Sequence, residues 1–274
     1  MTIAVRKATE DDLAPIAALT AGARRQRAEW EPEYFRVADG ADDAHERYLR
    51  ELLSGGDGVV PRVVTSDDEV VGCAFSVRQD HQWVVDDVAS ADEGWWSDGM
   101  QKLLRAVDER PALLCVPRSD IRQTGCADAL GMRLRSSFWR LGLDGAVPPS
   151  GADVAETDAA DLRPAPHQPL VVRPDDDGVT VLGEPSGGRA VLASPMPVVA
   201  PVYDPGGTTG LVDRVTGGRR GDLVDAAAHA AASRGDVQLV VVCAEDDPVL
   251  QDALIERAFH RVVDVYSWPD SFWA

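Results

Sequence analysis

Two adjacent carboxylates, Asp86 and Asp87, interrupt an apolar segment that reads as a β-strand from Trp83 to Ala89. Neighbouring residues of a strand point to opposite faces, so we expect one of the two side chains to face a cleft beside the sheet. Burial disfavours the charged form of a carboxylate and raises its pKa toward neutrality, where the group can accept a proton. A satisfied structural acid is the alternative for either residue.

The segment that carries this acid pair occurs twice in the chain. Val84–Val88 matches Leu211–Val215, and the later apolar run Ala112–Val116 matches Leu239–Cys243 in the same order. A repeat of this length is too long for a solenoid unit and indicates two related modules. Asp213 is then the counterpart of Asp86, and a shared structural role would explain both acids.

Length and composition agree with two domains. A chain of 274 residues can form two modest domains, each with its own core. The segment 145–169 is rich in Pro, Ala, Gly and Asp, which predicts a linker. We therefore expect an N-terminal domain over residues 1–145 and a C-terminal domain over residues 146–274.

The first half reads as β-α-α-β-β-β-α-β-α-β, because amphipathic and strand-like segments alternate in that order. Capping residues and apolar periodicity predict three of its helices, at 41–53, 96–107 and 121–130. The second half repeats the later elements and shows no counterpart of the first two helices. We expect the C-terminal domain to be truncated at its N-terminal side.

The charge of the chain excludes several partners. The net charge of −19 opposes binding to nucleic acid and to anionic lipid, and it suits a cationic small molecule or a basic peptide. Solubility alone is the alternative explanation. No apolar run is long enough to span a membrane, and the N-terminus lacks the regions of a signal peptide. We expect a cytoplasmic protein.

Cysteines and histidines do not form a recognisable ligand set. Cys73, Cys115 and Cys243 lie in apolar, strand-like runs, and no cysteine has CxxC spacing. The five histidines are scattered, and no two are placed four residues apart on a helix as a metal would require. We expect core cysteines and no metal site.

The order of elements and several short motifs resemble the GNAT superfamily of acyl-CoA-dependent N-acyltransferases, over nearly the whole chain. The resemblance implies an α/β fold of two tandem GNAT-like modules, with mixed, mainly antiparallel sheets flanked by helices and the second module truncated. The motifs that carry it are Val5–Asp12, Asp68–Gly72, Val85–Val88 and Leu130–Met132 in the first half and Leu211–Val215 and Arg257–Phe259 in the second.

The resemblance also implies where acetyl-CoA, the expected donor, would bind. In such enzymes the fourth strand splays from the fifth and pairs with the pantetheine arm, which assigns Val88 and Ala89 to the cofactor. The glycine-rich phosphate loop that normally follows this strand is absent, and only Ser97 and Gly99 stand as contacts there. Three carboxylates in this loop would oppose a diphosphate.

The glycine-rich segment Arg214–Asp222 is the better anion site of the two halves. It is a half-match to the phosphate loop of the family, and Arg219 and Arg220 are able to meet phosphate. An ordinary loop before a helix is the alternative for this segment.

The catalytic residues that the resemblance implies are only partly present. The family often protonates the departing thiolate with a tyrosine, but the matching positions hold Ala127 and Leu254, which cannot donate a proton. Its general base, commonly a carboxylate on the fourth strand, would be Asp87 or Asp86.

The acceptor wall of this fold corresponds to a segment in which aromatic and acidic residues alternate. Such a wall suits a cationic amine, although packing explains its aromatic residues equally well. The residues assigned to it are Trp30, Glu31, Glu33 and Tyr34.

The resemblance thus predicts an N-acyltransferase that transfers an acyl group from acyl-CoA directly to a small-molecule amine or a basic peptide. The alternative is a degenerate GNAT-like protein that serves in binding or interaction, as the altered loops of both halves suggest. A homodimer is left open.

Overall fold

The computed structural model divides the chain into two compact units. The first unit comprises residues 1–134, 200–203 and 265–274, and the second comprises residues 135–199 and 204–264. The structure describes residues 2–56, 58–79, 82–109, 112–143, 145, 153–157, 169, 172–173, 176–196 and 202–268, without the side chain of Glu93. Most of the predicted linker at 145–169 therefore lies outside the described residues.

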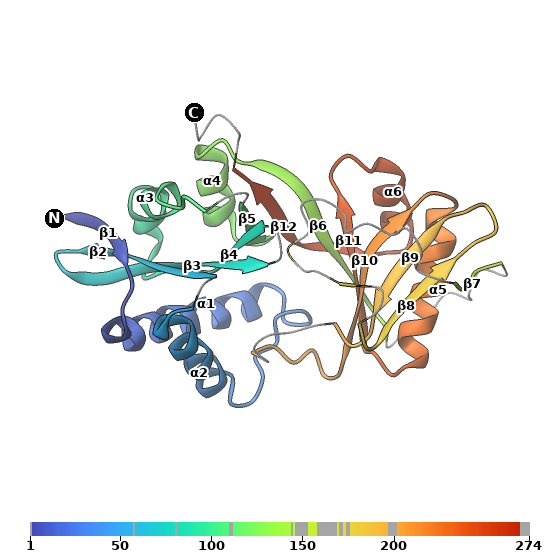
Figure 1. Ribbon diagram of the computed structural model, residues 1–274, viewed down its shortest axis with the longest axis horizontal. Coiled ribbons are helices and arrows are strands. Elements are labelled where there is room, and N and C mark those ends of the chain that lie inside the picture. Colours follow the sequence, from blue (N-terminus) through green and yellow to red (C-terminus); the bar gives the residue numbers. More distant parts are fainter. Residues whose placement is uncertain are drawn as a thin grey trace. The chain divides into compact units, whose positions relative to one another are not determined.

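The first unit is built on a mixed sheet in which β1–β5 lie side by side, with β12 next to β5 (Figure 1). Neighbours from β1 to β4 are antiparallel, whereas β4 and β5 are parallel. The strands are β1 (Ile3–Lys7), β2 (Val59–Ser66), β3 (Glu69–Gln79), β4 (Gln82–Ser90), β5 (Ala112–Pro117) and β12 (His260–Ser267).

Helices cover both faces of this sheet. Ile16 of α1 and Leu49 of α2 pack with Phe75 and Ala89 in one core, and Met100 of α3 and Ala127 of α4 belong to the other. The helices are α1 (Leu13–Trp30), α2 (Ala41–Ser54), α3 (Gly99–Arg105) and α4 (Ile121–Ala129), with short 3-10 turns η1 (Glu10–Asp12) and η2 (Glu93–Trp96). The helix predicted at 96–107 is found as the shorter α3, and Trp96, its expected first residue, ends η2.

A β-bulge in β4 decides where the acid pair points. Ala89 pairs with Cys73 and Asp86 with Phe75, so β4 carries one extra residue at this point, and Asp87 has φ +49°. Val85 and Val88 both belong to the core beneath α3 and α4. The two residues between them therefore both lie on the α1/α2 side, and the expectation of opposite faces is wrong because the bulge breaks the alternation.

The second unit is a mixed sheet with strand order β6-β11-β10-β9-β8-β7, and only β10 and β11 are parallel within it. Its core packs α5 and α6 against one face, through Leu223, Ala227 and Leu254. The elements are β6 (Arg133–Gly142), β7 (Ala155–Glu156), β8 (Val179–Gly183), β9 (Arg189–Ala193), β10 (Thr209–Thr216), α5 (Arg220–Ser233), β11 (Gln238–Ala244) and α6 (Pro248–Glu256). Among its described residues, no helices correspond to α1 and α2.

The bulge recurs in β10, with a different outcome. Val212 pairs with Leu192 and Arg214 with Val191, which leaves Asp213 as the extra residue. Asp213 and Arg214 are buried, and the Arg214 Nε donates to Asp213 Oδ2 at 2.8 Å. Burial nevertheless raises the pKa of Asp213 to about 6. The repeat thus keeps the backbone irregularity but replaces the acid pair by a buried ion pair.

The boundaries of the two units fall within β6 and β12 and not at the predicted linker. Residues 135–142 of β6 belong to the second unit, where they pair with β11. Conversely, residues 265–267 of β12 belong to the first unit, and Tyr266 and Trp268 are part of its core beneath α3 and α4. Each unit therefore includes residues from the other half of the sequence.

No helix within the described part of the chain is both long enough and apolar enough to cross a bilayer.

Replacing Trp268 by Ala tests whether the C-terminal residues contribute to the core of the first unit. Trp268 is 4% exposed within the core of the first unit, so we expect the free energy of unfolding to fall by about 3–5 kcal/mol in urea titrations. Ile121→Ala is the control, because Ile121 is 80% exposed and its truncation should change stability little. An unaltered urea midpoint for Trp268→Ala would contradict the assignment of the C-terminal strand to this core.

The buried Asp213 predicts a specific pH dependence of stability. A carboxylate with a raised folded-state pKa stabilises the fold while protonated; for a pKa of about 6 this contribution is lost as the pH rises through that value. Urea unfolding of the wild type and Asp213→Asn at several pH values measures it. Relative to the variant, the wild type should lose roughly 3 kcal/mol between acidic and neutral pH. A difference independent of pH would disprove the raised pKa.

Candidate active site

The acid pair, Asp86 and Asp87, stands where β4 and β5 part. The parallel register between these strands ends with Val85 opposite Leu114, immediately before the bulge. The Asp87 backbone N–H donates to Asp86 Oδ1 at 2.8 Å, so the two residues are joined directly. Asp86 is exposed to solvent and Asp87 is half-buried. Two carboxylates therefore lie together on one face at the end of the paired region.

His45 of α2 holds Asp87. The His45 Nε2 lies 3.1 Å from Asp87 Oδ2, and the imidazole is 3% exposed. The opposite ring nitrogen, Nδ1, is within hydrogen-bonding distance of Arg24 Nη1 and of Thr20 Oγ1. Asp87 is thereby tied to both helices that cover this face.

The two acids have opposite proton affinities. Surrounding protein atoms reduce hydration of Asp86 although solvent reaches it, and this desolvation, together with the charge of Asp87, raises the pKa of Asp86. Burial also opposes ionisation of Asp87, but the hydrogen bond from His45 and the charge of Arg27 outweigh it and lower the pKa of Asp87. Such a split is the arrangement that separates a proton acceptor from a permanently charged neighbour.

Two further side chains, Tyr48 and Arg27, interact with the acid pair, and Tyr203 interacts with Arg27. Burial and then the charges of both acids raise the pKa of Tyr48 on α2. Arg27 on α1 donates from Nη2 to the Val88 carbonyl at 3.3 Å. Although burial acts against its charge, Tyr203 and the two acids raise the pKa of Arg27. Tyr203 comes from the second half of the sequence and forms an antiparallel bridge with Val37 in the first unit.

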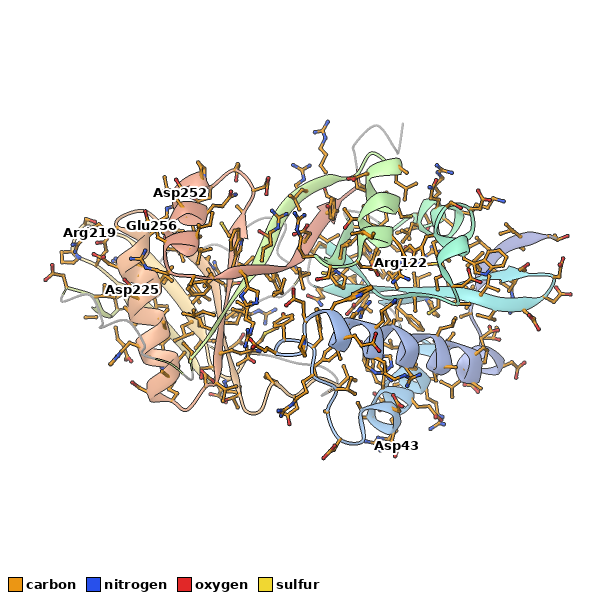
Figure 2. All side chains as sticks on the ribbon, turned by 180° about the vertical axis from the view of Figure 1, so that it is seen from behind. Asp43, Arg122, Arg219, Asp225, Asp252 and Glu256 are labelled. Carbon is orange, nitrogen blue, oxygen red and sulfur yellow. The ribbon has the colours of Figure 1, made fainter. Side chains whose placement is uncertain are left out.

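A cavity of about 540 Å³ borders the end of β4 beyond the bulge. Val88 and Ala89 line it, as does Trp30, so the structure places these three predicted residues around one space. Arg122 at the start of α4, labelled in Figure 2, also lines it and lies 5.3 Å over the Trp30 ring. Its remaining charged lining residues are Arg25, Arg27, Glu29, Asp92 and Asp120. We call this space the β4 cavity.

One amide of the loop after β4 is occupied by a side chain of the same loop. Asp92 Oδ1 accepts a hydrogen bond from the Gly94 backbone N–H at 2.8 Å, at the start of η2. Ser97 donates to the Gly94 carbonyl, and Gly99 is packed against Trp95 and Val64. Neither Ser97 nor Gly99 is among the residues that line the β4 cavity.

The corresponding loop of the second unit encloses a carboxylate. Gly217 and Gly218 both have positive φ, and Glu184 Oε1 accepts from the Arg219 backbone N–H at 2.6 Å. A Cβ on Gly218 would lie 1.3 Å from Glu184 Oε1, so the glycine is required by this close approach. The side chain of Glu184 is 1% exposed. A glycine turn able to hold an anion is thus filled by the protein itself.

Both predicted phosphate-binding arginines have carboxylate partners. Arg219, labelled before α5 in Figure 2, contacts Glu184, Asp153 and Asp222. Arg220 forms an ion pair with Asp247. Their charges are therefore compensated within the second unit.

The predicted acceptor wall is dispersed in the structure. Of the four predicted wall residues, Trp30 alone lines the β4 cavity. Glu31 follows the end of α1 and accepts a hydrogen bond from Ser119. Glu33 is exposed, and the Tyr34 ring packs edge-on against Phe35 at 4.7 Å. Ala127, at the position of the family's tyrosine, is fully buried beneath the sheet.

The partners of the acid pair were not predicted. His45 and Tyr48 lie within the helix predicted at 41–53, and the buried face of α2 directs His45 to Asp87. Their presence one turn apart on an apolar face was a usable signal. Arg27 and Tyr203 carried no local signal, because their proximity to β4 depends on tertiary structure.

Within the described residues, no group of three or more His, Cys, Asp or Glu side chains is arranged to hold a metal ion. Cys73, Cys126 and Cys243 are buried and Cys115 is half-buried, all as free thiols.

Comparison with protein-family models finds no match, and comparison with curated proteins finds none either. The structure is similar to a GCN5-related N-acetyltransferase from Sphaerobacter thermophilus, with a TM-score of 0.51 and 15% identity over 97% of this chain and 95% of that one. A tandem GNAT protein from the clavulanic acid biosynthesis pathway gives a TM-score of 0.47 and 16% identity over 98% and 99% of the two chains. A putative acetyltransferase from Pyrococcus horikoshii gives 0.47 and 11% over 97% and 88%.

At such identities the similarity concerns the fold. The expected architecture is confirmed: an α/β fold of two modules with mixed, mainly antiparallel sheets flanked by helices. The chain has the fold of the GCN5-related N-acetyltransferases.

Proposed function

We propose that the chain is an acyl-CoA-dependent N-acyltransferase whose catalytic site is in the first unit, with acetyl-CoA as donor and a small amine as acceptor. The observation that carries this proposal is the bulge of β4, which brings Asp86 and Asp87 together where β4 and β5 part, beside the β4 cavity. The fold and the acidic face support the same assignment.

The reaction needs one proton acceptor of near-neutral pKa. An amine enters as an ammonium ion, which the charge of Asp87 attracts, and Asp86 takes one proton from it. The free amine attacks the thioester carbonyl, the N–C bond forms and the C–S bond breaks. The second nitrogen proton passes to the departing thiolate, and Asp86 later releases its proton to solvent.

The donor would enter by the β4 cavity. Val88 and Ala89 offer strand edge to an extended pantetheine arm, and Trp30 and Trp96 offer apolar walls. In the loop after β4, Asp92 already accepts the hydrogen bond of the Gly94 amide. The cationic side chains of the cavity wall would therefore have to bind the phosphates. Arg122 suits this role, since Asp120 and Gln26 hold its guanidinium in place.

Three observations favour a second candidate, a GNAT-like binding protein without catalysis. Arg27 already donates to the Val88 carbonyl, a backbone acceptor that a pantetheine amide would use. Asp92 and Glu184 each accept a hydrogen bond from one amide of the loop that would hold a diphosphate in its unit. A ligand other than acyl-CoA, or a basic protein segment, would then occupy the first unit.

Calorimetric titration with acetyl-CoA and with free CoA separates the two candidates. Under the proposed function, saturable binding is expected, and Arg122→Ala should weaken it by about tenfold, the loss of one charge-assisted contact. Arg219→Ala combined with Arg220→Ala is the control, because both arginines are paired in the second unit, and its affinity should match the wild type. Absence of binding at millimolar ligand would exclude acetyl transfer and leave the binding protein.

Replacing Asp86 by Asn tests its role as proton acceptor. We expect kcat in an amine acetylation assay to fall by about a hundredfold or more, with the KM for acetyl-CoA unchanged, because the amide cannot accept the proton. Asp213→Asn is the matched control, since Asp213 is the repeat counterpart of Asp86 in the second unit, and its activity should be retained. Equal loss in both variants would point to damage to the fold rather than to the chemistry.

A further inference from the structure

We propose that His45, held in one tautomer by Arg24, keeps Asp87 as the ionised member of the acid pair and thereby assigns proton transfer to Asp86. The assignment of the catalytic step rests on the proposed function, whereas the hold of His45 on Asp87 does not. His45 is a positioning residue in this scheme, because it acts on the reaction only through Asp87.

The tautomer follows from the donors around the ring. A guanidinium can only donate hydrogen bonds, and Arg24 Nη1 points at His45 Nδ1, so Nδ1 must accept. The ring hydrogen is therefore on Nε2, which donates to Asp87 Oδ2 at 3.1 Å. The Asp87 carboxylate receives this bond only while it is ionised on that oxygen.

Arg24 is itself fixed. It is 4% exposed, and its Nη2 donates to Asp42 Oδ1 at 2.6 Å. Thr20 donates to the Ile16 carbonyl at 3.0 Å, so its hydroxyl leaves Nδ1 to the guanidinium. The contacts form a chain from Asp42 through Arg24 and His45 to Asp87, and this chain connects α2, α1 and β4.

The consequence for Asp86 follows from the charge of its neighbour. Because Asp87 stays ionised, removing the proton from Asp86 places a second negative charge beside the first, which raises the pKa of Asp86. Loss of the hydrogen bond from His45 would make the ionised form of Asp87 less stable, and the proton would then be shared between Asp86 and Asp87. The titratable and charged groups that interact with the pair from the surrounding elements are Arg24, Arg27, His45, Tyr48, Cys73 and Cys115, while Tyr203 acts on Arg27 and Glu51 acts on Tyr48.

The first test is NMR of the full-length protein and needs no activity. Nitrogen-15 shifts should show His45 with an unprotonated Nδ1 and a protonated Nε2 at neutral pH, and carboxyl carbon-13 titration should place the pKa of Asp87 below that of Asp86. In His45→Phe the Asp87 value should rise by about one unit, whereas His45→Gln, which can still donate an N–H, should shift it less. A hydrogen on Nδ1, or an Asp87 titration unaltered in both variants, would overturn the proposal.

The second test is the pH dependence of kcat for an acetylated amine. His45→Phe should move the acidic limb of the profile to higher pH by about one unit, because the fully ionised acid pair loses the hydrogen bond that His45 donates to Asp87. His45→Gln should restore part of the shift. His229→Gln, an exposed histidine of α5, is the matched control and should leave the profile unchanged.

The two tests also distinguish two failures. A wild type without acetylation activity, whose NMR titration nevertheless responds to His45, would refute the proposed function and leave the hold of His45 on Asp87 standing. An active wild type whose profile and titration ignore both His45 variants would refute the positioning role alone.

Discussion

A single extra residue in β4 determines the chemistry available to the first unit. Val85 and Val88 are both required in the core beneath α3 and α4, which forces Asp86 and Asp87 to the same side of the sheet. Asp87 meets this demand in a left-handed conformation that aspartate tolerates better than most residues. Two like charges then lie side by side, and Arg27 and His45 compensate them.

The second unit has the same backbone bulge but lacks the acid pair. Its bulge places Asp213 and Arg214 between Val212 and Val215, and the two side chains neutralise each other out of contact with solvent. Its glycine turn closes around Glu184 instead of an external anion. The second unit therefore differs from the first in two respects. An arginine replaces the second acid, and an internal carboxylate fills the glycine turn.

Much of the fold could be predicted from the sequence, because apolar periodicity and capping act locally. The helix expected at 41–53 is found at Ala41–Ser54, and the repeat anticipated two related modules. The expected alternation of side chains between the two faces fails at Asp87. Val85 and Val88 are three residues apart, and both can face the same core only if a bulge lies between them. The division of β6 and β12 between the units and the contact of His45 with Asp87 depend on pairing between distant segments, which no local pattern records.

Arg27 connects the parts of the first unit on which the proposed chemistry depends. Its guanidinium donates to the Val88 carbonyl at the edge of the β4 cavity, and its charge lowers the pKa of Asp87 after His45 has done so. Tyr203, from the second half of the sequence, favours its charged form. A substrate that displaced Arg27 from Val88 would therefore alter the electrostatics of the acid pair as it entered. Under the proposed function, occupancy of the cavity and the proton affinity of Asp86 would be coupled through this one side chain.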